Sequence, residues 1–210
     1  MTDEVRDSYD AMAERYTALA LGDLDRIPSD RDWLAAFAEL ARSHPGAVAD
    51  LGCGPGHVVH HLTELGLTVT GSDITPGLIA AARRTFPDLS FRVGDLSALD
   101  VADASLGGIV SRYSPIHMLP DPLGSFFWEW RRAREPGAPV LVSFFAAPSA
   151  EAHGAPFDHA VVTAYQLHPD KIAGQLQDAG FGGVEIGMRS PLEGERPLDH
   201  GTVLARKPIT

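Results

Sequence analysis

The sequence predicts an α/β fold built on a doubly wound, mostly parallel sheet. Short apolar runs alternate with amphipathic helical stretches through residues 45–145, and the connections between them are short. A glycine-rich turn at residues 52–56 follows the first run, and an acidic residue stands at the end of each of the first three runs. Because the carboxyl ends of parallel strands meet at one edge of a sheet, these features predict a ligand site at that edge.

Two helices are predicted ahead of the sheet. Residues 4–20 carry apolar side chains at intervals of three and four, which is typical of a single amphipathic helix. Residues 21–28 form a break, and residues 29–42 form the second helix, with Ser29 or Asp30 as its N-cap.

The remaining elements are expected in alternation. Strands are predicted at 47–51, 67–72, 89–93, 106–111 and 139–145, and helices at 57–65, 76–85 and 126–134. The tail departs from simple alternation, with an irregular stretch at 146–159, a strand at 160–166, a helix at 169–179 and strands at 184–188 and 202–205.

The glycine turn is suited to a close approach between the backbone and a ligand. Glycine has no Cβ and reaches positive φ at little cost, and the helix that follows offers free N–H groups at its positive end. Asp50 precedes the turn, Asp73 lies about twenty residues after it, where an acid accepts from ribose hydroxyls, and Asp95 follows the third strand. These acids predict one nucleoside-bearing ligand across the sheet edge.

The spacing of the glycines narrows the ligand class. Gly52-x-Gly54-x-Gly56 departs from the Gly-x-Gly-x-x-Gly of nicotinamide enzymes, and a pyrophosphate would gain nothing from Asp50. A cationic amino-acid end would gain from that carboxylate. S-adenosylmethionine carries an ammonium and a sulfonium and has no phosphate, so it fits this pattern.

On these residues the sequence resembles the class I S-adenosylmethionine-dependent methyltransferases, of the bacterial type that acts on small molecules. The matching stretches are VADLGCGPG at 48–56, TGSDITPG at 70–77, VGDLSAL at 93–99 and IVSRYSPIHMLP at 109–120. Together with the element order they cover residues 1–210. The resemblance implies a Rossmann-like sheet that ends in an antiparallel C-terminal strand pair. It also implies S-adenosyl-L-methionine as cofactor and methyl transfer, by direct displacement, to an O, N or C atom of a small-molecule acceptor.

The resemblance further implies how the cofactor is held. Asp73 would accept from the ribose hydroxyls, and Ile74 would pack on the adenine face. Asp95 would meet the adenine amino group, with Leu96 supplying a backbone contact. In the family a Tyr-Asp-x-x-Ala-x-x-Tyr segment, here residues 9–16, lies over the cofactor, although a helix that only packs on the core fits the pattern equally well. The implied cofactor-binding residues are Tyr9, Tyr16, Asp50, Gly52, Gly54, Gly56, Asp73, Ile74, Asp95, Leu96 and Arg112.

Candidate catalytic residues lie in the loop after the fourth strand. The family often has Tyr-Ser-x-x-His there, which Tyr113, Ser114 and His117 match. His117 is the best candidate for a general base, because histidine titrates near neutral pH. Its alternative role is to bond loop backbone and hold the turn that faces the cofactor. Tyr113 would line the methyl channel or orient the nucleophile, and Arg112 would meet a carboxylate or lie on the surface.

The segment 146–168 is interpreted as a substrate lid. An apolar pocket wall beside His153 or His159 is expected from aromatic side chains of this segment and of the preceding strand. These side chains are Phe144, Phe145, Phe157 and Tyr165. His153, His159 and His168 lack the tightly paired spacing of a compact metal site, so no metal is predicted.

Composition bounds the partners. A net charge of −11 over 210 residues disfavours nucleic acid, which requires clustered Lys and Arg. No apolar run approaches the roughly 20 residues that span a bilayer, and the acidic start argues against a signal peptide. The single Cys53 allows no internal disulfide and fits a reducing cytoplasm. The expected partner is a small-molecule methyl acceptor, and the oligomeric state stays open.

Two other functions are compatible with the sequence. A binding or regulatory protein could keep the fold and the donor site without transferring a methyl group, because the substrate half of the site has no diagnostic motif. A nicotinamide-dependent oxidoreductase lacks the expected glycine spacing. We expect one domain with four parts: helices that cap the cofactor site (1–44), a cofactor-binding core (45–145), a substrate lid (146–168), and a C-terminal helix with strands (169–210).

Overall fold

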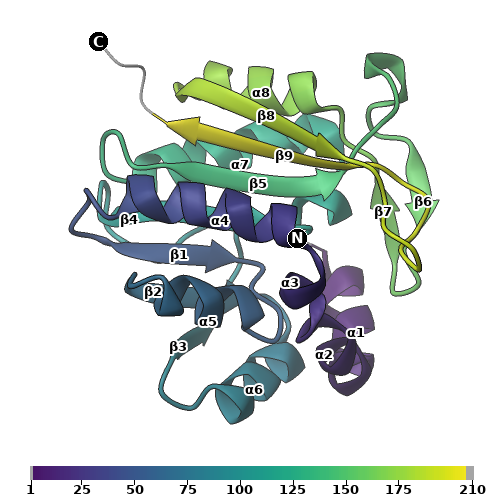
Figure 1. The fold of residues 1–210 in the computed structure, drawn as a ribbon, viewed down its shortest axis with the longest axis horizontal. Coiled ribbons are helices and arrows are strands. Elements are labelled where there is room, and N and C mark those ends of the chain that lie inside the picture. The colour runs from purple at the N-terminus through teal and green to yellow at the C-terminus, as the bar shows by residue number, and fades with distance from the viewer. Residues whose placement is uncertain (1, 207–210) are drawn as a thin grey trace.

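The computed structural model describes residues 2–206 and shows one central sheet with helices on both faces (Figure 1). The sheet order is β3-β2-β1-β4-β5-β9-β8. The strands β1 to β5 run parallel, β9 is antiparallel to β5, and β8 is antiparallel to β9. This arrangement confirms the doubly wound, mostly parallel sheet with an antiparallel C-terminal pair. The seven strands are β1 Ala47–Leu51, β2 Val69–Asp73, β3 Ser90–Val93, β4 Leu106–Arg112, β5 Val140–Phe145, β8 Gly182–Arg189 and β9 His200–Arg206.

Five helices cover the two faces. On one face lie α4 Pro28–Ala41, α5 His57–Glu64 and α6 Pro76–Thr85, and on the other lie α7 Pro120–Ala133 and α8 Pro169–Asp178. The central strand β4 is buried on both sides, which is why it reads as a continuous apolar run. Within residues 2–206, no helix has the length and apolar character that a bilayer crossing requires.

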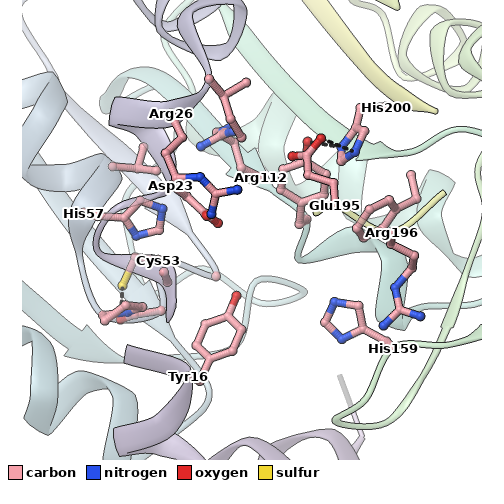
Figure 2. Close-up of a pocket in the computed structure, with 18 of the residues that line it drawn as sticks. Tyr16, Asp23, Arg26, Cys53, His57, Arg112, His159, Glu195, Arg196 and His200 are labelled. Atoms are coloured by element: carbon pink, nitrogen blue, oxygen red, sulfur yellow. Dashed lines mark hydrogen bonds and ion pairs between the residues drawn. The ribbon is translucent and has the colours of Figure 1, made fainter. Parts of the chain in front are cut away.

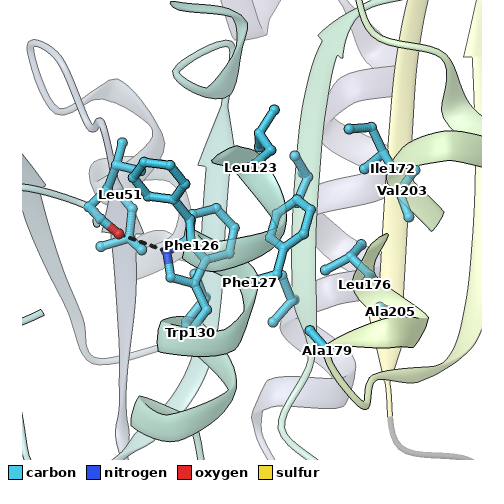
Figure 3. Packing of buried hydrophobic residues seen from close by; sticks show 14 of the residues in the cluster. Leu51, Leu123, Phe126, Phe127, Trp130, Ile172, Leu176, Ala179, Val203 and Ala205 are labelled. Atoms are coloured by element: carbon cyan, nitrogen blue, oxygen red, sulfur yellow. Dashed lines mark hydrogen bonds between the residues drawn. The ribbon is translucent and has the colours of Figure 1, made fainter. Parts of the chain in front are cut away.

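The larger core lies between the sheet and helices α7 and α8. Figure 3 shows Phe127 of α7 between Trp130 of the same helix and Leu176 of α8. The Trp130 indole donates a hydrogen bond of 2.9 Å to the backbone oxygen of Leu96, so even this buried ring has its polar atom satisfied. This core fixes the strand ends that carry the site.

The N-terminal segment is not the single helix that its apolar stripe predicted. It is divided into α1 Asp3–Ala11 and α2 Ala13–Ala20, because Met12 leaves helical geometry at φ −114° and ψ 8°. In an unbroken helix Tyr9 and Tyr16 would lie about 10 Å apart along the axis. The break brings their rings into an edge contact with centroids 5.1 Å apart. A short helix, α3 Asp23–Arg26, occupies the predicted break.

Two other helix starts differ from the prediction. Helix α4 begins at Pro28 with Ile27 as its N-cap, because proline suits the first helical position. Asp30, predicted as a possible cap, is instead buried and binds arginines from two strands. Helix α7 begins six residues before the predicted 126, again at a proline.

The predicted lid contains a small hairpin. Strands β6 Pro156–Asp158 and β7 Thr163–Tyr165 pair antiparallel, so the predicted strand at 160–166 is shorter than expected. A 3-10 helix at Ala150–Ala152 precedes the hairpin. Figure 1 places this hairpin and helices α1 to α3 at the edge of the sheet where β1 and β5 end. Residues 207–210 of the predicted C-terminal part lie outside the described residues.

Candidate active site

The glycine turn after β1 has the predicted left-handed backbone. Gly52, Gly54 and Gly56 have φ values of 78°, 52° and 89°. A side chain at Gly52 would collide with Ser114 in the loop after β4, so a glycine is required there. The carboxylate of Asp73 holds the turn, since its Oδ2 accepts from the Gly54 N–H and its Oδ1 from the Thr75 N–H, both at 2.9 Å.

Asp50 is a buried acid at the end of β1 with no partner for one oxygen. Its side chain is 1% exposed, and its Oδ2 accepts no hydrogen bond from the described residues. Burial raises the pKa of Asp50 to about 7, with a smaller rise from Asp73 and an opposing effect of Arg112. A buried carboxylate without a partner is costly, so a cationic group placed beside it would be stabilised there.

Two neighbouring cavities lie at this edge and share several lining residues. The first, about 280 Å³, extends from Asp50 and the glycine turn to the β8–β9 connection (Figure 2). The second, about 40 Å³, is a narrow slot beneath helices α1 and α2, lined by Asp73 and Ile74 among others. The residues that line both are Tyr16, Gly52, Gly54, Arg112 and Tyr113.

Most residues predicted for the site come together here. The predicted residues that line one or both cavities are Tyr9, Tyr16, Asp50, Gly52, Gly54, Asp73, Ile74, Arg112, Tyr113 and His117. Three predicted cofactor residues, Gly56, Asp95 and Leu96, line neither cavity. Gly56 is the N-cap of α5, and the Leu96 side chain lies in the core. The Oδ1 of Asp95 accepts from the Ser97 N–H at 2.8 Å. Burial alone would raise the pKa of Asp95, but hydrogen bonding, with Ser97 as the main partner, lowers it overall.

Arg112 lies at the cavity but is already paired. Its guanidinium donates to Asp30 at the start of α4, and Asp30 also accepts from Arg189 of β8 at 3.3 Å. Arg189 in turn makes two hydrogen bonds, of 2.6 and 3.0 Å, to Glu195. This chain of ion pairs ties α4, β4 and the β8–β9 connection together on one side of the cavity.

His117 is buried, with both ring nitrogens engaged by the protein. Its Nδ1 lies 3.4 Å from the backbone oxygen of Thr163 in the lid hairpin, and its Nε2 lies 2.7 Å from the Tyr9 hydroxyl. Because a carbonyl can only accept, Nδ1 carries the proton and Tyr9 donates to Nε2. Burial, with a smaller effect of His159, lowers the pKa of His117 to about 4. His117 therefore joins helix α1 to the lid in the neutral form.

Tyr113 forms a second tyrosine–histidine pair. Its φ of 55° is unusual for a non-glycine residue and turns its ring into the cavity region. Its hydroxyl lies 2.7 Å from Nδ1 of His200, whose Nε2 is 3.6 Å from a Glu195 oxygen. Burial raises the pKa of Tyr113 to about 12, and burial together with Arg189 lowers that of His200 to about 4. His200 is thus neutral and can accept a hydrogen bond from the phenol at Nδ1.

Sequence reasoning missed His200 as a site residue. It follows no motif and lies 87 residues after Tyr113. Only the antiparallel pairing of β9 with β5, which sets His200 opposite Phe145, brings it to the cavity. The last strand was predicted at 202–205. A predicted pairing of this strand with the strand at 139–145 could have placed His200 near the site.

Residues 146–168, the predicted lid, contribute fewer side chains to the cavities than expected. Phe145 and His159 line the first cavity, but Phe144 points the other way along the strand and is buried in the core. Tyr165 lines a separate cavity of about 490 Å³ on the far side of His117. His153 accepts from the backbone N–H of His168 at 2.9 Å. Among residues 2–206 no three His, Cys, Asp or Glu side chains are grouped to hold a metal ion.

Comparisons with known proteins identify the family of the chain. Residues 48–137 match the methyltransferase domain family. A demethylmenaquinone methyltransferase from Beutenbergia cavernae is 30% identical over 146 residues, which cover 69% of this chain and 59% of that protein. One from Renibacterium salmoninarum is 26% identical over 70% of this chain and 61% of its own length. The chain thus spans less than two thirds of the length of these relatives.

The fold has solved counterparts over its whole length. A magnesium protoporphyrin IX methyltransferase from Synechocystis PCC 6803, solved with bound SAH, has a TM-score of 0.72 with 21% identity and covers 97% of both chains. At that identity the likeness shows the fold, and the family follows from the domain match and the relatives. The chain therefore belongs to the class I S-adenosylmethionine-dependent methyltransferases.

Proposed function

We propose that this protein binds S-adenosyl-L-methionine and transfers its methyl group to an O, N or C atom of a small-molecule acceptor in the cytoplasm. The observation that carries the proposal is Asp50, a buried carboxylate with a free oxygen beside the glycine turn. A cationic amino-acid end would supply the missing partner, and a phosphate would be repelled.

The donor would be held by residues of both cavities. The ammonium would meet Asp50, the methionine part would lie along Gly52 and Gly54, and the ribose would lie at Asp73, whose oxygens keep lone pairs beyond the two N–H bonds they accept. The side chain of Ile74 would pack on the adenine. Tyr9 and Tyr16, from helices α1 and α2, would close over the donor, in line with their place above the narrow slot.

When bound, S-adenosylmethionine would supply a methyl group on a positively charged sulfur, which leaves as a neutral thioether. The protein then has to align the acceptor atom and exclude water. Alignment of this kind contributes roughly 7–11 kcal/mol in favourable cases. Tyr113 is placed for it, because it lines both cavities and its backbone is held in a strained conformation.

We also propose Tyr113 and His200 as the route for an acceptor proton. The Tyr113 hydroxyl would accept the proton of an acceptor O–H or N–H while passing its own to Nδ1 of His200, 2.7 Å away. His117 stays a predicted base, but both of its nitrogens are engaged, and we assign it the role of holding Tyr9 and the lid. The domain would then work as a cap (1–44), a core (45–145), a lid (146–168) and a C-terminal part (169–210).

The test is methyl transfer from labelled S-adenosylmethionine to a panel of phenols, amines and carboxylic acids. Tyr113→Phe should lower kcat about 10²-fold or more for acceptors that begin protonated, and far less for carboxylates, which have no proton to lose. Tyr165→Phe serves as control, because no hydrogen bond of its hydroxyl is found among the described residues. Equal losses for both acceptor classes would refute the proton route. Donor binding without transfer to any acceptor would favour a regulatory protein.

A further inference from the structure

Four arginines line the first cavity, and only some of them form an ion pair with an acidic side chain. Those that line it are Arg26, Arg112, Arg189 and Arg196. Arg112 and Arg189 are bound by Asp30 and Glu195. Among the described residues Arg26 and Arg196 form no ion pair. Arg26 lies on the side of Asp50 and the glycine turn, where the donor is proposed to bind (Figure 2).

Arg196 lies on the opposite side of the cavity. It belongs to the connection between β8 and β9, and its Cζ is 5.6 Å from the centre of the Phe157 ring in the lid. Figure 2 shows its guanidinium beside His159 and across the open space from Tyr16. Arg196 and His159 form this wall of the cavity, and Phe157, which does not line it, packs against both, with its ring 6.1 Å from that of His159.

The acids near Arg196 form no ion pair with it among the described residues. Both Glu195 oxygens are taken by Arg189, and one of them also accepts from the Leu192 N–H. The Oδ1 of Asp158 accepts from the Ala160 N–H at 2.9 Å. The guanidinium of Arg196 therefore faces the cavity with no counter-charge within ion-pair distance among the described residues.

We propose that Arg196 binds a carboxylate on the methyl acceptor. The substrate is then a carboxylic acid whose remaining part is aromatic or otherwise apolar. This proposal rests on the proposed methyltransferase function. The planar fork of a guanidinium matches the two oxygens of a carboxylate. Apolar surface for the rest of the acceptor is supplied by Phe145, whose ring is 5.2 Å from both Phe157 and Tyr113.

The surroundings of His159 support this assignment. Burial first, and then the Arg196 charge, lower the pKa of His159 to about 4, and an opposing effect of Asp158 is smaller. A carboxylate bound between them would satisfy Arg196 and favour the charged form of His159. In this arrangement Arg196 recognises the carboxylate of the acceptor. The atom that is methylated is a different one, held at the end of the cavity where Tyr113 lies.

The experiment measures binding of 3-phenylpropionate and its neutral amide, by calorimetry, to the protein loaded with S-adenosylhomocysteine. Phenylacetate and 4-phenylbutyrate, each with its amide, are also tested, so that a poor fit of one distance between ring and carboxylate does not determine the result. Three proteins are compared: the natural protein, Arg196→Gln, and the control Arg31→Gln, which changes a half-exposed arginine outside the cavity. We expect at least one acid to bind better than its amide, and Arg196→Gln to weaken that acid about tenfold or more. The control should leave it unchanged.

Several results would overturn the assignment: no binding by any acid, equal binding of acid and amide, or the same affinity in Arg196→Gln. A tenfold loss of S-adenosylhomocysteine affinity in Arg196→Gln would show that Arg196 binds the methyl donor and not the acceptor. The donor titration is made first and separately. If the donor does not bind, the proposed function fails, whereas the acid and amide comparison on the unloaded protein still reports on Arg196.

Discussion

At the residue scale, the proposed donor site depends on one carboxylate, that of Asp50. The pKa of Asp50 is raised to about 7 by burial, so this side chain is half protonated near neutral pH. Only the ionised form attracts an ammonium. Donor binding should therefore weaken as the pH falls below 7, by up to about tenfold per pH unit for one proton.

Calorimetric Kd values for S-adenosylhomocysteine between pH 5.5 and 8 check this prediction. The loss on the acid side should disappear in Asp50→Asn, which binds weakly at every pH because it cannot ionise. Asp25→Asn, a change at an exposed acid outside both cavities, should keep the natural profile. A flat profile in the natural protein, or an unchanged slope in Asp50→Asn, would contradict the role given to Asp50.

Local sequence pointed to some residues that line the cavities and missed others. Asp50, Asp73, Gly52 and Gly54 follow from the order strand, turn, helix, because that order fixes where the chain can approach a ligand. His200 and Arg196 could not be predicted in this way. They reach the cavity through the pairing of β9 with β5 and through the connection before it, which are contacts between distant parts of the chain.

At the scale of elements, the N-terminal helices and the lid are joined by one hydrogen-bonded group. The Tyr9 hydroxyl binds Nε2 of His117 at 2.7 Å and lies 3.5 Å from Nδ1 of His159. Tyr9→Phe should lower the free energy of unfolding by about 1–3 kcal/mol, because it leaves a buried nitrogen of His117 without a partner. Urea unfolding measures the change, and hydrogen exchange should show faster opening of α1.

The matched control is Tyr165→Phe, which removes a hydroxyl with no hydrogen bond found among the described residues. It should change the free energy of unfolding much less than Tyr9→Phe. Equal effects of the two substitutions, with unchanged exchange in α1, would show that the Tyr9–His117 contact does not hold the helix on the lid.

Element boundaries were predictable where hydrophobic periodicity controls them. The strands and helices of the core were located to within a few residues, apart from the start of α7. The break at Met12 was not predictable, because the apolar stripe continues through it and the turn is explained only by the approach of two tyrosines. The hairpin β6–β7 was only partly predictable, since its strands are three residues each and are too short for a period of two to be recognised in the sequence.

At the scale of the whole molecule, one sheet edge brings the proposed donor and acceptor sites together. The ends of β1, β2 and β4 supply the donor side, and the connection between β8 and β9 with the lid supplies the acceptor side. The fold class followed from alternation alone, because parallel strands require helical crossovers. The acceptor did not follow, because the residues facing it come from segments without a shared motif.

Calorimetric titration of the purified protein with S-adenosylmethionine, S-adenosylhomocysteine and the oxidised nicotinamide dinucleotide tests the central claim most directly. We expect micromolar binding of both sulfur nucleosides and none of the dinucleotide, since Asp50 attracts an ammonium and repels a pyrophosphate. Failure of both sulfur nucleosides to bind the folded protein would contradict the donor site, and the methyltransferase function proposed from it would be wrong.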